Sequence, residues 1–167
     1  CNEIYLYKII FGTTVKNDEK KELIIYGKQP VYEALRSEHP ATKIYLAKEM
    51  DKKDTYKISS LAKSKAVEII YTRKADLQKI CGPVLHQGVA ANLDEYQYLS
   101  EEQLLHKISL SNEPFVLILD QIQDPHNLGA IIRTAECAGI TAIILPEKGS
   151  AGVTSTVAKT SAGSVFH

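Results

Sequence analysis

The fold of this chain is decided by Phe115-Val-Leu-Ile-Leu-Asp120-Gln-Ile-Gln-Asp124-Pro-His126-Asn127-Leu-Gly129-Ala-Ile-Ile-Arg133-Thr-Ala-Glu-Cys-Ala-Gly139. Its apolar beginning predicts a strand over 115–120, and a polar turn then leads into an amphipathic helix over 127–138. A second apolar run at 142–145 predicts another strand. Strand, helix and strand form one β-α-β unit, which is right-handed by default. Ligands of open α/β sheets gather where strands end and helices begin, so we expect the chemistry here.

The alternation of strand and helix patterns continues through most of the chain and predicts the α/β class. The run from Asp94 to Leu99 marks a boundary, so we expect an N-terminal extension at 1–22 and domains at 23–96 and 97–167. Further strands are expected at 4–11, 43–47, 67–71 (buried) and 87–93. Further helices are expected near Pro30, after an Asp54 cap, at 75–80, after a Ser100–Gln103 capping box and at 154–159.

Composition restricts the class of protein. Apolar residues make up 44% of the 167 positions, enough for a buried core, and twenty basic residues balance twenty acidic ones. Lysines concentrate in the first half of the chain, where they form either an ordinary solvated surface or a patch that faces phosphate. Three cysteines without a CxxC pair suit a reduced, cytoplasmic protein. The apolar run at 4–12 is shorter than the ~20 residues of a membrane helix.

Missing motifs exclude several kinds of site. The sequence has neither the GxxxxGK[ST] of a P-loop nor a GxGxxG after the strand at 115–120. Its histidines lack the HExxH spacing and any paired-ligand spacing, so no zinc site is expected. Asp120 and Asp124 could share Mg²⁺ in a phosphotransfer site, but a clear third ligand is missing. We predict no metal site and keep this phosphotransfer reading as an alternative.

The turn and the helix that follows it have two interpretations. Asp-Pro favours a turn and Asn127 is a good helix cap, which requires no further function. At ~100° per residue, however, His126, Gly129 and Arg133 share one stripe of the helix. Arg133 then projects beside very small residues, where another backbone or a ligand can approach, and its planar guanidinium fits phosphate. The other interpretation of Arg133 is an ion pair with Glu136 or with another neighbouring carboxylate.

The run LDQIQDPHNLGAIIRTAECAG resembles motif 1 of the SpoU (TrmH-like) RNA 2′-O-ribose methyltransferases, a family of the knotted SPOUT superfamily. VAKTSAGS at 157–164 is similar to the next small-residue segment of that family. YGKQPVYEAL at 26–35 and LHQGV at 85–89 resemble the two ends of its RNA substrate-binding domain. The resemblance implies a small ribosomal-protein-like α/β RNA-binding domain, followed by the N-terminal part of a SPOUT methyltransferase domain with a mostly parallel sheet.

The same resemblance implies a methyltransferase that uses S-adenosylmethionine to methylate the 2′-oxygen of a ribose. The substrate that the resemblance favours is a guanosine of large-subunit ribosomal RNA. Arg133 and Asn127 match the family's catalytic positions. A guanidinium is a poor base, so we expect Arg133 to bind the adjacent phosphate and to stabilise the developing alkoxide.

Substrate contacts are implied for five further residues. In the methyltransferase domain they are Asp124 and His126, and in the RNA-binding domain they are Lys28, His86 and Gln87, with lysines supplying salt-dependent affinity. No residue is assigned to the cofactor. The resemblance also implies RNA, most of all ribosomal RNA, as partner, and a homodimer for the full-length protein, without membrane association.

The resemblance is incomplete at one end. The adenosyl-binding segments of the family, a Gly-Glu loop and a Ser-Leu-Asn loop, lie beyond the equivalent of His167. We therefore expect the chain to be a fragment that binds the cofactor poorly and is inactive alone. The alternative is a non-catalytic RNA-binding module with a degenerate methyltransferase half-domain.

Overall fold

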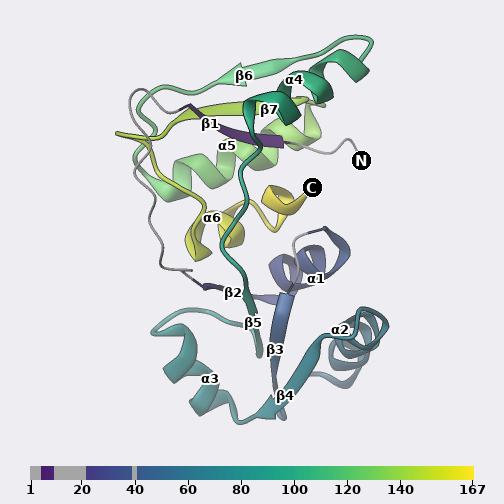
Figure 1. Ribbon diagram of the computed structural model, residues 1–167. Helices are drawn as coiled ribbons and strands as arrows, with labels where there is room; N and C mark the ends of the chain where they lie inside the picture. Colours follow the sequence, from purple (N-terminus) through teal and green to yellow (C-terminus); the bar gives the residue numbers. More distant parts are fainter. Residues whose placement is uncertain (1–4, 10–21, 39–40) are drawn as a thin grey trace. The chain divides into compact units, whose positions relative to one another are not determined.

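The computed structural model describes residues 5–9, 22–38 and 41–167 (Figure 1). The chain divides into two compact units. The accessory unit comprises Lys20–Tyr96 together with Phe166, and the crossover unit comprises Gln97–Val165 together with the N-terminal strand and His167. Both units combine helices with a sheet, and each sheet contains parallel strands, so the predicted α/β class is confirmed.

The accessory unit contains a four-stranded sheet with the order β2-β5-β3-β4. Its strands are β2 (Leu23–Tyr26), β3 (Ala41–Ala47), β4 (Glu68–Thr72) and β5 (Val89–Leu93). β3 and β4 are parallel, and β5 is antiparallel to both β2 and β3. β2, β3 and β4 therefore run in one direction, and each leads into a helix: α1 (Lys28–Arg36), α2 (Lys52–Ser64) and α3 (Lys74–Cys81). All three helices consequently begin at the edge of the sheet where those strands end.

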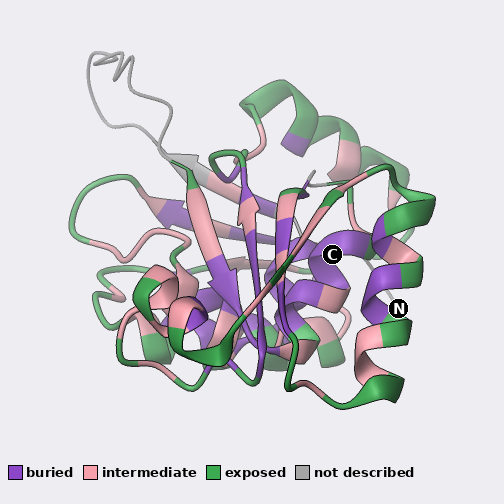
Figure 2. Ribbon diagram, turned by 90° about the horizontal axis from the view of Figure 1, so that it is seen from below, coloured by how far each residue is buried: buried purple, intermediate pink, exposed green. Residues whose placement is uncertain are grey.

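The core of the accessory unit lies along the central strands. Ile44 in β3 and Val89 in β5 are completely buried, and α1 packs Val31 and neighbouring apolar residues against the sheet. Figure 2 shows buried residues concentrated in strands and on the inner sides of helices. The strand predicted at 67–71 is present as β4, but the prediction that it is buried was wrong. β4 is an edge strand with one neighbour, and Tyr71 is half exposed. The strand at 23–26 was not foreseen.

The helix caps show where local sequence patterns were sufficient. Ser100 and Gln103 form the expected capping box at the start of α4 (Glu101–Leu110). The predicted Asp54 cap was wrong, because α2 starts earlier. Asp51 caps this helix, and its Oδ1 accepts hydrogen bonds from the N–H groups of Lys53 at 2.9 Å and of Asp54 at 3.3 Å.

The crossover unit contains a parallel sheet with the order β1-β7-β6. The strands are β1 (Tyr5–Ile9), β6 (Val116–Ile118) and β7 (Ala142–Pro146). Helix α5 (Pro125–Cys137) connects β6 to β7, which confirms the predicted β-α-β unit. A short helix, α6 (Ser155–Thr160), and a 3₁₀ turn, Ser164–Phe166, follow. The N-terminal strand, which we expected only as part of an extension, pairs with β7 along its whole length.

Candidate functional site

The predicted site of the crossover unit is the turn between the end of β6 and the start of α5. Asp124 caps the helix, and its carboxylate accepts a hydrogen bond from the His126 N–H at 2.9 Å. Pro125 occupies the first helical position, where its missing N–H costs nothing. The prediction that Asn127 caps the helix was therefore wrong, because the Asp-Pro pair starts α5 two residues earlier.

Arg133 and Asn127 are both exposed on α5. Neither side chain forms a hydrogen bond or an ion pair with any residue that the structure describes. The ion pair considered for Arg133 is not formed, since the carboxylate of Glu136 instead accepts a hydrogen bond from Ser164 Oγ at 2.5 Å. Six residues on a helix correspond to a rise of about 9 Å and roughly a third of a turn between the two side chains.

On the stripe of α5 that contains His126, Gly129 and Arg133, Gly129 is covered by α6. A Cβ atom placed on Gly129 would lie 2.7 Å from Thr160 Cβ, 3.0 Å from the Val157 carbonyl oxygen and 3.1 Å from the Ser161 nitrogen. His126 also lies beside this helix, with Nδ1 3.4 Å from Thr160 Oγ1. The expectation that another backbone approaches this stripe is confirmed. The sequence did not indicate that the backbone would be that of α6.

One lysine of α6 differs from an ordinary surface lysine. Partial burial lowers the pKa of Lys159, because removal from water disfavours the charged ammonium. The residue precedes Thr160, the α6 side chain that lies beside His126. Lys159 was not predicted as a site residue, since its only signal in the sequence is its place in the small-residue segment at 157–164.

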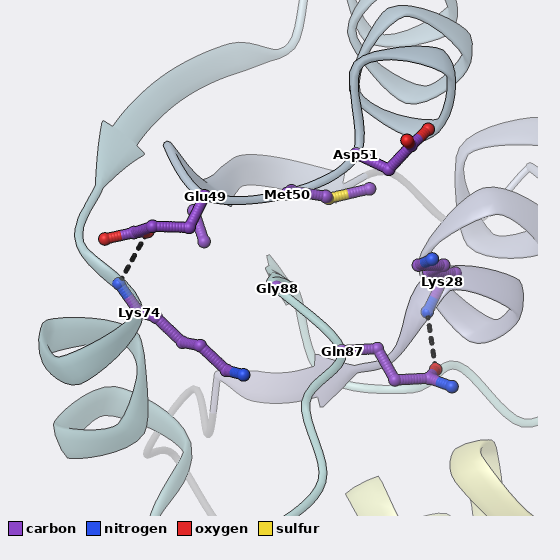
Figure 3. A pocket seen from close by; sticks show the side chains of 8 residues that line it. Lys28, Glu49, Met50, Asp51, Lys74, Gln87 and Gly88 are labelled. Carbon is purple, nitrogen blue, oxygen red and sulfur yellow. Dashed lines mark hydrogen bonds between the residues drawn. The ribbon is translucent and has the colours of Figure 1, made fainter.

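A cavity of about 300 Å³ lies at the helix-bearing edge of the accessory unit (Figure 3). The structure brings together here two residues that were predicted to contact RNA. The backbone N–H of Lys28 donates to Gln87 Oε1 at 3.1 Å, so the Gln87 side chain caps α1, whose own cap residue is a glycine. The Lys28 ammonium pairs with the carboxylate of Asp54. The cavity is lined by Lys28, Ala47, Glu49, Met50, Asp51, Lys74, Gln87 and Gly88.

The loop before β5 has an unusual backbone conformation. Gln87 and Gly88 both lie in the left-handed region, with φ of 56° and 85°. For a residue with a side chain this conformation costs of the order of 1 kcal/mol, and it persists only where surrounding contacts enforce it. Such contacts are present: the Gly88 N–H donates to His86 Nδ1 at 3.1 Å, and the Gly88 carbonyl accepts from the Ala47 N–H at 2.8 Å.

His86 lies inside the accessory unit rather than on its surface, with 2% of its area exposed. The direct RNA contact expected for this residue is therefore not available to its ring as placed here. Burial lowers the pKa of His86, and the positive charge of Lys74 lowers it further. A neutral imidazole can accept the hydrogen bond from Gly88, so His86 holds the loop that presents Gln87.

The lysines of the accessory unit are only partly neutralised. Lys43 pairs with Glu68, and Lys79 pairs with Asp76. The Lys57 ammonium lies 3.8 Å from the centre of the Tyr32 ring, a cation–π contact. Other lysines are exposed, namely Lys48, Lys52, Lys53, Lys63, Lys65 and Lys74. Lys16, Lys20 and Lys21 lie outside the described residues.

Within residues 5–9, 22–38 and 41–167, no three side chains of His, Cys, Asp or Glu gather as potential metal ligands. In the same part of the chain, every helix is too short or too polar to cross a membrane.

Comparison with known protein families divides the chain in two. Residues 24–99 match the model of the RNA 2′-O ribose methyltransferase substrate-binding domain. Residues 114–167 match the SpoU rRNA methylase family.

Curated relatives carry names of the same kind. YacO of Bacillus subtilis, named as a TrmH-family tRNA/rRNA methyltransferase, is 38% identical over 145 residues, which cover 86% of this chain and 57% of the relative. A protein of Mycobacterium avium, named as an uncharacterized tRNA/rRNA methyltransferase, is 37% identical over 150 residues, which cover 89% of this chain and 48% of the relative. The chain thus spans about half the length of these relatives.

Solved structures share the fold. An rRNA methyltransferase from Sinorhizobium meliloti superposes with a TM-score of 0.68 at 23% identity, covering 87% of this chain and 52% of the other. The SpoU methyltransferase AviRb of Streptomyces viridochromogenes, crystallised with S-adenosylmethionine, gives a TM-score of 0.65 at 21% identity, with 87% and 51% covered.

Proposed function

Because this chain belongs to the SpoU methylase family and carries the family's RNA substrate-binding domain, we propose that it takes part in 2′-O-methylation of a ribose in RNA. The methyl donor would be S-adenosylmethionine, the compound bound to AviRb. The proposed target is a guanosine of large-subunit ribosomal RNA. The observation that carries the proposal is Arg133, an exposed guanidinium on α5 with no partner among the described residues.

The proposed role of Arg133 follows from its charge and position. A guanidinium remains protonated at every physiological pH, so it does not remove the proton of the 2′-hydroxyl. It can hold the phosphate beside the ribose through two parallel N–H donors. The same positive charge stabilises negative charge on the 2′-oxygen while the hydroxyl proton passes to water or to a base other than Arg133.

The other predicted residues have narrower roles. Asn127, exposed on the first turn of α5, can donate a hydrogen bond to a phosphate oxygen and can donate to or accept from a ribose hydroxyl. The Asp124 carboxylate already accepts the His126 N–H, so it orders the turn that any bound RNA would meet. We propose that His126 positions substrate from beside Thr160.

The methyl donor supplies a methyl group already activated by its sulfonium centre. His126, Asn127 and Arg133 on α5 are all open to solvent. We therefore assign no residue of this chain to the donor, and the roles above concern the RNA alone. We also propose that the full-length protein is a homodimer and lies in the cytoplasm, where ribosomal RNA is found. Light scattering of the full-length protein measures whether it is a dimer.

The test uses the full-length enzyme and RNA from cells that lack its gene. Arg133→Ala should lower the methylation rate at least about a hundredfold, as loss of one transition-state donor commonly does. Lys148→Ala removes an exposed positive charge from the same unit and should leave the rate unchanged. Circular dichroism should be the same for all three proteins.

The site of methylation decides between the proposal and its alternatives. Mapping 2′-O-methyl groups in ribosomal and transfer RNA, with and without the gene, should show one ribose that loses its mark. A mark lost from a base nitrogen, or an unchanged rate in Arg133→Ala, contradicts the proposal. A full-length protein that binds RNA and transfers no methyl group supports the non-catalytic RNA-binding module.

A further inference from the structure

The cavity of the accessory unit follows from the direction of its strands. β2, β3 and β4 end at one edge of the sheet, so the first turns of α1, α2 and α3 meet there, and β5 begins at the same place. The cavity measures about 300 Å³. Ligand pockets range from about 300 to 1,000 Å³, so this one accommodates a single small unit.

The lining of the cavity combines two kinds of chemistry (Figure 3). Met50 and Ala47 supply an apolar wall, and the Met50 side chain lies over Gly88. A Cβ atom on Gly88 would lie 3.3 Å from Met50 Cβ, so glycine allows this close approach. Lys28 and Lys74 reach the cavity from two different helices. A polarizable thioether packs well against the face or edge of an aromatic ring.

The two carboxylates of the lining are already engaged. Glu49 Oε2 accepts the Lys74 backbone N–H at 3.1 Å and so caps α3, whose own cap residue provides no side-chain bond. Asp51 caps α2. The Lys74 ammonium forms no hydrogen bond or ion pair with the described residues, and its end extends toward Gln87 in Figure 3. A ligand with both an aromatic ring and a negative charge therefore fits the free groups.

We propose that this cavity binds one unpaired nucleotide of the RNA substrate, with the base against Met50 and a phosphate on Lys74. The inference rests on the proposed function, because that function makes RNA the ligand. A paired stretch does not fit, since the bases of an A-form helix are stacked and its deep groove is closed to side chains. Bases in loops and bulges can leave the stack and enter a pocket of this size. The accessory unit thus selects RNA by an unstacked nucleotide.

The chain itself offers a local probe of this cavity. Met50 is the only methionine in the sequence, so its ¹³C-labelled methyl group gives one assignable NMR signal for the pocket. We expect a single-stranded RNA oligonucleotide to shift this signal in the 167-residue chain. The same oligonucleotide, annealed to its complement, should leave the signal in place. A methyl signal that stays fixed while the single strand binds overturns the proposal.

Two variants separate the contact with the base from the contact with phosphate. Lys74→Ala should weaken binding of the single strand roughly three- to tenfold and reduce its salt dependence by about one phosphate contact. Lys79→Ala, on the exposed face of the same helix, is the matched control. It should change neither the affinity for the single strand nor its salt dependence by more than about twofold. Met50→Ala should weaken binding about two- to tenfold with an unchanged salt slope. Equal effects of Lys74→Ala and Lys79→Ala contradict the assignment.

The outcomes distinguish this inference from the proposed function. If methylation is found at a ribose but the Met50 signal and the Lys74→Ala affinity do not respond, the cavity is not the nucleotide site and the activity stands. If both respond but the full-length protein methylates no ribose, the nucleotide site stands and the activity does not.

Discussion

Replacement of Gly129 by alanine tests the contact between α5 and α6 that shapes the crossover unit. The added methyl group would lie 2.7 Å from Thr160 Cβ and within 3.1 Å of two backbone atoms of α6. Distances this short are not tolerated, and backbone atoms cannot rotate away as a flexible side chain can. The two helices must therefore separate, or the methyl group must distort α5.

Two opposing terms set the size of the effect. Overpacking of a close contact costs about 1–3 kcal/mol, and the backbone partners favour the upper half of that range. Alanine in a helix interior is better than glycine by about 1 kcal/mol. The net change should therefore be a loss of about 1–2 kcal/mol in the free energy of unfolding of the crossover unit, or roughly a 5- to 30-fold change in its folding equilibrium.

Amide hydrogen exchange measures this loss unit by unit. Protection in α5 and β7 should fall by that factor in Gly129→Ala, while amides of α1 in the accessory unit serve as the internal reference. Ala130→Gly, at the exposed neighbouring position, measures the difference in helix propensity between alanine and glycine without the overpacking. If Gly129→Ala gains stability by about the size of that difference, α6 does not pack on α5 as described.

Two further predictions concern the accessory unit. The lowered pKa of His86 means that the unfolded chain binds a proton near pH 6.5 while the folded unit resists it, so stability should fall as the pH drops from 6.5 toward the folded pKa. The slope is at most about 1.4 kcal/mol per pH unit for one proton. Urea midpoints measured at pH 7.5, 6.5 and 5.5 should show this loss of stability. The pH dependence should flatten in His86→Gln and persist in His106→Gln. A pH dependence that survives His86→Gln assigns the effect to another group. Asp51→Ala should destabilise the unit by about 0.5–2 kcal/mol through loss of the α2 cap. Asp54→Asn removes only a part-exposed ion pair and should cost about 0–1 kcal/mol, so a larger loss in this variant than in Asp51→Ala is the contradicting result.

Local patterns determined most of the secondary structure. The capping box at Ser100 needs only residues three apart, and the sequence showed it without further context. The start of α5 shows the limit of such reasoning, because both Asp124 and Asn127 are good caps. Pro125 decides between them, since proline fits the first helical position and Asp124 then precedes it.

Features that depend on neighbours distant in sequence were not predicted. β4 reads as a buried strand, but its exposure depends on whether another strand pairs with its outer edge, and none of the described strands does. The polar residue His86 looks like a surface contact in the sequence. Its burial follows from the turn at Gln87 and Gly88, which takes the ring inside to accept a backbone N–H.

The sequence by itself determined the α/β alternation and the crossover, because each depends on periodicity or on neighbours within one helix turn. The tertiary structure alone decided that α6 covers Gly129, and that Met50, Lys74 and Gln87 line one cavity. These residues come from segments 13 to 37 positions apart. Strand order and direction bring them to the same edge, and no local pattern encodes that order.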